Sequence, residues 1–143
     1  MPDDESESVW HACLRDAVEE VSAALGPGLT ESIYQHALAA ELRARGFVVE
    51  VEKIFEIKYK NQSVGFLRAD LVVDGRAVLE LKTVAKITDA HIAQLDAYMR
   101  QMANRICTGA VINIDVRGGV EIKTLETAID WGVPSVTESL VKD

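Results

Sequence analysis

The most constraining feature of this chain is a segment in which charged residues interrupt two strand-like apolar runs. In RADLVVDGRAVLELK, residues 68–82, the runs are separated by an Asp-Gly pair, which is typical of hairpin turns. Asp70 lies in the first run, and Glu80 and Lys82 lie in the second. Charged side chains are rare in buried strands unless they pair or bind an ion. The segment therefore predicts a hairpin that carries a functional or ion-paired cluster.

The register of this hairpin decides whether the charged residues meet. A two-residue Asp-Gly loop would place Asp70 and Glu80 on opposite faces of the sheet. A three-residue loop over 73–75, ending in a left-handed glycine, places Asp70 opposite Val78 and diagonal to Glu80, on the same face. Lys82 is two residues beyond Glu80 and shares its face. A shared site therefore requires the three-residue loop, and the structural alternative is a carboxylate–lysine pair at the rim of the sheet.

Hydrophobic periodicity predicts the other elements. The run from Cys107 to Val116 is almost continuously apolar, as in a strand covered on both faces. After Glu126 the helical tendency is weak and Pro134 interrupts it. We expect helices at residues 9–25, 30–46 and 88–104, and strands at 47–59, 64–73, 77–82, 107–116 and 120–125.

This order predicts a single α/β domain over residues 1–143, with a mixed central sheet flanked by helices. Residues 1–7 form a loose acidic N-terminus, and residues 126–143 form a C-terminal extension. No apolar run approaches the ~20 residues of a membrane helix, and the acidic N-terminus is unlike a secretory signal. We therefore expect a cytoplasmic protein without membrane association. Cys13 and Cys107 are expected as reduced, buried thiols.

Two carboxylates beside a lysine have a plain chemical use. Asp70 and Glu80 offer hard oxygen ligands to Mg²⁺, which takes one or two carboxylates and keeps waters for a substrate phosphate. The carbonyl of Leu81 is a further candidate ligand. Such an ion polarises a phosphoryl oxygen and acidifies a bound water, while Lys82 orients that water or offsets charge in the transition state.

Two helices carry further polar residues on one face. Glu31 and Tyr34 are three residues apart at the start of the second predicted helix. His91, Gln94 and Tyr98 share one face of the third. Taken singly, such residues are more often core-edge aromatics, capped histidines or surface amides.

Several of these segments resemble a known family at consistent spacing. GLTESIY at residues 28–34 resembles the signature of the GxxExxY family, a branch of the PD-(D/E)xK nuclease superfamily. Asp70 with the ELK of 80–82 resembles the catalytic core of that superfamily, although Ala69 replaces the proline of its motif. HIAQL with Tyr98 resembles the helix that follows, and VIN at 111–113 resembles the next strand. The similarity spans residues 16–124 in the right order.

The resemblance implies a restriction-endonuclease-like αβββαβ core with an extra N-terminal helix, and a set of site residues. Metal ligands would be Glu31, Asp70, Glu80 and the carbonyl of Leu81; catalytic residues would be Lys82, Asp70, Glu80 and Gln94; Tyr34, His91 and Tyr98 would line the site.

We therefore expect a nuclease that depends on Mg²⁺ or Mn²⁺ and cleaves DNA more readily than RNA, as an endo- or exonuclease. The alternative is a non-catalytic nuclease-fold module that binds nucleic acid or a protein partner. The net charge of −8 favours that alternative, because a broad basic surface is absent, whereas the intact Asp, Glu and Lys set counts against it. A third reading is a homodimer with paired sites, for which residues 131–136 offer an apolar interface.

Overall fold

The computed structural model describes residues 8–102, 106, 108–128 and 135–142 of the chain. The part from α2 to β4 has the expected α-β-β-β-α-β order, and α1 is the expected extra N-terminal helix. The predicted bounds of α1 and β3 match the observed ones. The elements are α1 (Val9–Leu25), α2 (Glu31–Ala44), β1 (Val49–Tyr59), β2 (Gln62–Val73), β3 (Ala77–Lys82), α3 (Asp89–Gln101), β4 (Thr108–Ile114), β5 (Val120–Ala128) and β6 (Ser135–Lys142).

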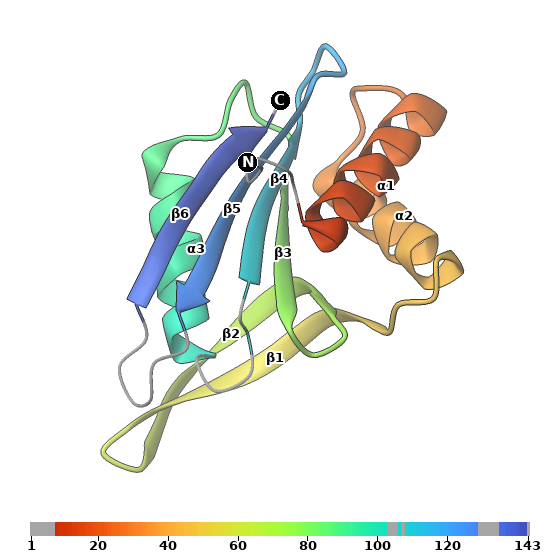
Figure 1. The fold of residues 1–143 in the computed structure, drawn as a ribbon. Coiled ribbons are helices and arrows are strands. Elements are labelled where there is room, and N and C mark those ends of the chain that lie inside the picture. The colour runs from red at the N-terminus through yellow and green to blue at the C-terminus, as the bar shows by residue number, and fades with distance from the viewer. Residues whose placement is uncertain (1–7, 103–105, 107, 129–134, 143) are drawn as a thin grey trace.

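A six-stranded sheet forms the central layer, in the order β1-β2-β3-β4-β5-β6. β3 and β4 are parallel, and all other neighbours in this sheet are antiparallel, so the sheet is mixed as predicted. α3 makes the crossover that a parallel pair requires. Helices α1 and α2 cover one face of the sheet and α3 covers the other (Figure 1).

Side chains of the central strands alternate between two cores, one on each face of the sheet. On β4, Ala110 and Ile112 pack into the core under α1 and α2, and Val111 packs into the core under α3. Every residue of β4 is buried. This confirms the prediction of a strand covered on both faces.

Tyr34 closes the turn between α1 and α2. Gly26 ends α1 with a φ of 77°, a conformation that favours glycine. The Tyr34 hydroxyl donates to the Gly26 carbonyl at 2.6 Å and accepts from the Leu29 N–H at 3.2 Å. Its side chain is buried in the core under the two helices. Tyr34 therefore fixes the entry into α2, and with it the position of Glu31.

We expect Tyr34→Phe to lower the free energy of unfolding by about 1–3 kcal/mol, because two backbone groups of the turn lose their partner. Urea denaturation followed by circular dichroism measures this. Ser32→Ala, at an exposed position of the same helix, is the matched control and should change stability by less than about 0.5 kcal/mol. Equal stability of Tyr34→Phe and the wild type would contradict the structural role.

The C-terminal residues differ from the prediction. A weak helical tendency was expected after Glu126, but β5 continues to Ala128 and β6 pairs with it antiparallel. The exposed edge of β5 offers unpaired backbone groups, and pairing with them outweighs a weak local preference. Residues 129–134, which include most of the suggested dimer interface, lie outside the described residues, as do Cys107 and the predicted end of the third helix at 104.

Within the described ranges, no helix is both long enough and apolar enough to cross a membrane.

Candidate active site

The loop between β2 and β3 contains residues 74–76, not the predicted 73–75. Val73 pairs with Ala77, so the register is shifted from both alternatives considered from the sequence. Asp74 explains the difference, because its N–H donates to the carbonyl of Val48 at 2.7 Å and its carboxylate accepts from the N–H of Val48 at 2.9 Å. This contact with the start of β1 is a tertiary one that the hairpin sequence does not reveal.

β2 and β3 separate at Asp70 and Glu80, and the two carboxylates fill the gap. Strand pairing ends at Leu71 and Leu79, and the same register places Asp70 directly across from Glu80. The Asp70 Oδ2 accepts from the N–H of Leu81 at 2.8 Å, and the Glu80 Oε2 accepts from the N–H of Asp70 at 3.1 Å. Each carboxylate keeps a second oxygen outside these two bonds. We call this pair, Asp70 and Glu80, the carboxylate wedge.

The backbone of Leu81 also faces the wedge. Its N–H donates to Asp70, and the N–H and C=O of one strand residue point to the same side of the strand. The carbonyl of Leu81 therefore points into the same gap, while its side chain packs into the core under α1 and α2. Two carboxylate oxygens and one carbonyl oxygen thus border this break in the sheet.

The wedge holds more negative charge than its surroundings compensate. Glu80 is only 7% exposed, and its burial, followed by the charge of Asp70, raises the pKa of Glu80 to about 8. Burial also raises the pKa of Asp70, against the opposing effects of the Leu81 N–H and the Lys82 charge. Lys82 acts on both carboxylates through its charge and forms no hydrogen bond or ion pair with the described residues. The wedge is therefore short of a directly bound cation.

Glu52 on β1 is a further carboxylate beside Asp70. It has a φ of 55°, in the left-handed region, where β1 twists so that Val51 packs under α1 and α2 but Phe55 packs under α3. Gln35, buried on α2, donates to Glu52 at 3.3 Å, and the charge of Glu52 contributes to the raised pKa of Asp70. Sequence reasoning missed both residues.

Glu31 holds the chain directly after Lys82. Its Oε2 accepts from the N–H and from the hydroxyl of Thr83, both at 3.3 Å. Glu31 also contributes by its charge to the raised pKa of Asp70. The structure therefore brings Glu31 to the edge of the wedge, where it positions the end of β3.

Two more side chains hold the loop that follows β3. Asn113 on β4 accepts from the N–H of Val84 at 2.8 Å and donates to its carbonyl at 2.9 Å. Glu121 on β5 accepts from the N–H of Ile87 at 2.9 Å. Asn113 is 1% exposed, and a single amide within an apolar strand was a detectable signal for this role.

The predicted residues of α3 separate into three roles. Tyr98 lies near the wedge, and burial, then the charges of Glu80 and Asp70, raise the pKa of Tyr98. His91 caps the helix, because its Nδ1 accepts from the N–H of Thr88 at 3.0 Å. Gln94 is exposed, and the structure gives it no partner among the described residues. Of the lining residues predicted from the sequence, only Tyr98 therefore interacts with the wedge, since Tyr34 is engaged in the α1–α2 turn.

Comparison with known proteins bears on this arrangement. The model of the PD-(D/E)XK nuclease superfamily matches residues 7–125. This span includes the wedge, Lys82 and every element from α1 to β4. The chain belongs to the PD-(D/E)XK nuclease superfamily. No curated protein and no solved structure gives a match. The mixed sheet with flanking helices is accordingly the restriction-endonuclease-like α/β fold of PD-(D/E)XK proteins, whose members generally require a divalent metal.

The donor set of this PD-(D/E)XK domain fits a hard divalent ion. Among the described residues, no three His, Cys, Asp or Glu side chains converge as metal ligands, and Glu31 is engaged with Thr83. Mg²⁺ does not need a third side chain, because it is commonly bound by one or two carboxylates and keeps several waters. The uncompensated charge of the wedge and the nearby Leu81 carbonyl provide such a set.

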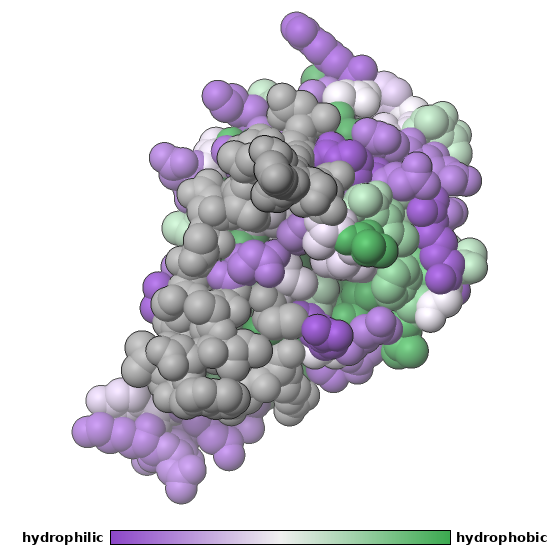
Figure 2. Space-filling model, in the orientation of Figure 1, coloured by the Kyte–Doolittle hydropathy of each residue, from purple (hydrophilic) through white to green (hydrophobic). Residues whose placement is uncertain are grey.

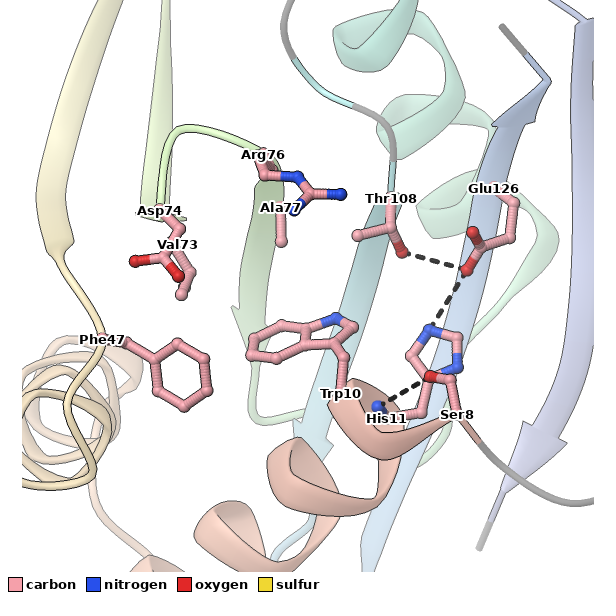
Figure 3. A pocket seen from close by; sticks show the side chains of 10 residues that line it. All are labelled: Ser8, Trp10, His11, Phe47, Val73, Asp74, Arg76, Ala77, Thr108 and Glu126. Atoms are coloured by element: carbon pink, nitrogen blue, oxygen red, sulfur yellow. Dashed lines mark hydrogen bonds and ion pairs between the residues drawn. The ribbon is translucent and has the colours of Figure 1, made fainter.

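A cavity of about 480 Å³ in the PD-(D/E)XK domain lies away from the wedge, at the start of β3 (Figure 3). Trp10 and Phe47 form an apolar wall with their rings edge to face, 5.4 Å apart. The Nε2 of His11 lies 3.1 Å from Glu126, whose carboxylate also accepts from the Thr108 hydroxyl at 3.1 Å. The wedge and Lys82 do not line this cavity.

Proposed function

We propose that this PD-(D/E)XK protein is a divalent-metal-dependent nuclease that hydrolyses phosphodiester bonds, with Mg²⁺ or Mn²⁺ held by Asp70, Glu80 and the Leu81 carbonyl. The carboxylate wedge carries the proposal, since the buried Glu80 and the partly buried Asp70, with insufficient counter-charge, lie beside a lysine at a break between strands. A bound ion at this place polarises a phosphoryl oxygen and supplies an acidified water.

Three side chains of the chain take the remaining roles in the proposed reaction. Lys82 offsets the charge that develops on the phosphate or orients the attacking water, and its amine is uncommitted within the described structure. Gln94 lies four residues before Tyr98 on the same face of α3 and assists at the mouth of the site. Glu31 keeps Lys82 in place through Thr83. The GLTESIY segment, with Glu31 in its fourth position, supports assignment to the GxxExxY branch.

A cleavage assay tests the proposal. Wild-type protein is incubated with duplex DNA, single-stranded DNA, branched DNA and RNA, in Mg²⁺, in Mn²⁺ and in EDTA. We expect cleavage that requires the metal and falls about 10²–10³-fold or more in Asp70→Asn. Asp89→Asn, at an exposed position in the first turn of α3, is the matched control and should cleave as the wild type does.

Metal binding by the same proteins distinguishes a nuclease from a non-catalytic module. Calorimetry with Mg²⁺ should detect binding to the wild type and weaker binding to Asp70→Asn. Absence of cleavage on every substrate, together with absence of metal binding, would overturn the proposal and favour a nuclease fold that only binds a partner.

A further inference from the structure

The outer part of the β1–β2 hairpin projects beyond the sheet as a two-stranded ribbon. β2 pairs with β3 only from Leu71 onward, so residues 62–69 pair with β1 alone, and β1 is the edge strand. Figure 1 shows this ribbon extending to the lower left, away from the other strands. We call residues 54–68 the arm.

The arm is basic, whereas the chain as a whole is acidic. Residues 54–68 contain Lys58, Lys60 and Arg68 against one acidic residue, Glu56, in a chain with a net charge of −8. Lys58 and Arg68 have carboxylates at 3.9 and 3.8 Å, in exposed ion pairs of little energetic weight. The end of the arm is hydrophilic in Figure 2. A polyanion is therefore attracted here although the whole chain would repel it.

One face of the arm also carries uncovered apolar side chains. Ile54, Val64 and Phe66 alternate along the strands on the same face, and Phe66 is 66% exposed. Phe55, on the other face, packs against the core under α3. The arm is thus anchored by one face and presents the other to a partner. This outer face carries apolar and basic residues, with the single carboxylate Glu56 opposite Phe66.

We propose that the arm binds duplex DNA by lying in its major groove, with Lys58, Lys60 and Arg68 on phosphates and Phe66 against base edges. This rests on the proposed nuclease function. The major groove of B-DNA admits a two-stranded ribbon, whereas the deep, narrow groove of duplex RNA does not.

The position of the arm relative to the wedge supports this assignment. β2 continues from the arm directly to Asp70, and Arg68 forms its ion pair with Glu52, whose charge also acts on Asp70. Because a strand advances ~3.3 Å per residue, the tip lies roughly 30 Å from Asp70. The arm would therefore hold a duplex over about one helical turn next to the reacting phosphate.

Fluorescence anisotropy with a labelled 24-base-pair duplex in EDTA tests the proposal on the uncleaved substrate. We expect the double variant Lys58→Gln, Lys60→Gln to bind roughly tenfold more weakly at low salt, and the slope of log Kd against log salt to fall by about two. The matched control is Arg100→Gln, Arg117→Gln, which removes the same charge from exposed positions elsewhere and should bind as the wild type does. Phe66→Ala should weaken binding without changing the slope.

Equal affinities and slopes for the arm and control variants, both melting as the wild type does, would overturn the proposal. So would an effect confined to single-stranded DNA or duplex RNA, or a change in oligomeric state of the arm variant on analytical ultracentrifugation. Cleavage of the same duplex in Mg²⁺ separates the two proposals. If the duplex is cleaved but its binding does not depend on the arm, only the proposal for the arm is wrong. If binding depends on the arm but the duplex is not cleaved, only the proposed nuclease function is wrong.

Discussion

Lys82→Met cleaves at least about 10²–10³-fold more slowly than the wild type, while it still binds Mg²⁺. The methionine keeps the apolar stem but removes the only cation that acts on both carboxylates of the wedge among the described residues. Loss of one preorganised charge from a partly buried active site costs a factor of this size in kcat. Single-turnover cleavage of duplex DNA measures the rate, and calorimetry measures the metal affinity.

Lys86→Met is the control for this variant. Lys86 is exposed in the loop after β3, four residues beyond Lys82, so its removal changes the net charge equally. Its cleavage rate should stay within about twofold of the wild type, as expected for a surface substitution away from the reacting atoms. If Lys82→Met cleaves as fast as Lys86→Met, Lys82 has no part in the reaction.

Glu80→Gln stabilises the metal-free protein at pH 8. In the folded chain the pKa of Glu80 is raised from 4.5 to about 8. Between these values the folded state keeps a proton that the unfolded state has released, so the free energy of unfolding falls as the pH rises from about 4.5 to about 8. The loss is on the order of 5 kcal/mol at full extent. Glutamine is neutral throughout and avoids it.

Thermal melts in EDTA from pH 5 to pH 9 measure this effect. The two proteins should have similar melting temperatures near pH 5, and the variant should melt several degrees higher at pH 8. Added Mg²⁺ should raise the melting temperature of the wild type more than that of Glu80→Gln, because the ion takes the place of the proton. If the difference in melting temperature between the wild type and Glu80→Gln does not change with pH, Glu80 is not a buried carboxylate that lacks a counter-charge.

Local patterns in the sequence were sufficient for the elements from α1 to β5, but not for β6. Period-two alternation placed Asp70 and Glu80 on one face only if the loop had three residues, and the observed loop has three. The register was wrong, because Asp74 is anchored to Val48, just before β1, and this contact has no trace in the hairpin itself. Which face a strand residue occupies depends only on whether its position is odd or even, and the register error was of two residues in total. Asp70 and Glu80 therefore still share a face, but they lie directly opposite each other instead of diagonally.

Other features could not be predicted because they depend on tertiary packing. Nothing local marks Glu52 as a residue with positive φ, since glutamate rarely adopts that conformation. Tyr34 was placed in the site by the family resemblance, yet its hydroxyl closes the turn before α2. The strand at the C-terminus forms on the edge of β5, where backbone pairing decides the structure.

The loop after β3 makes the active site a late product of folding. Its three anchors come from α2, β4 and β5, so the loop that directly follows Lys82 takes its position when those elements have docked. Glu121 is more than thirty residues downstream of this loop in the sequence. A growing chain on the ribosome therefore exposes its carboxylates and lysine well before it arranges them, and hydrolytic competence comes only with the completed sheet.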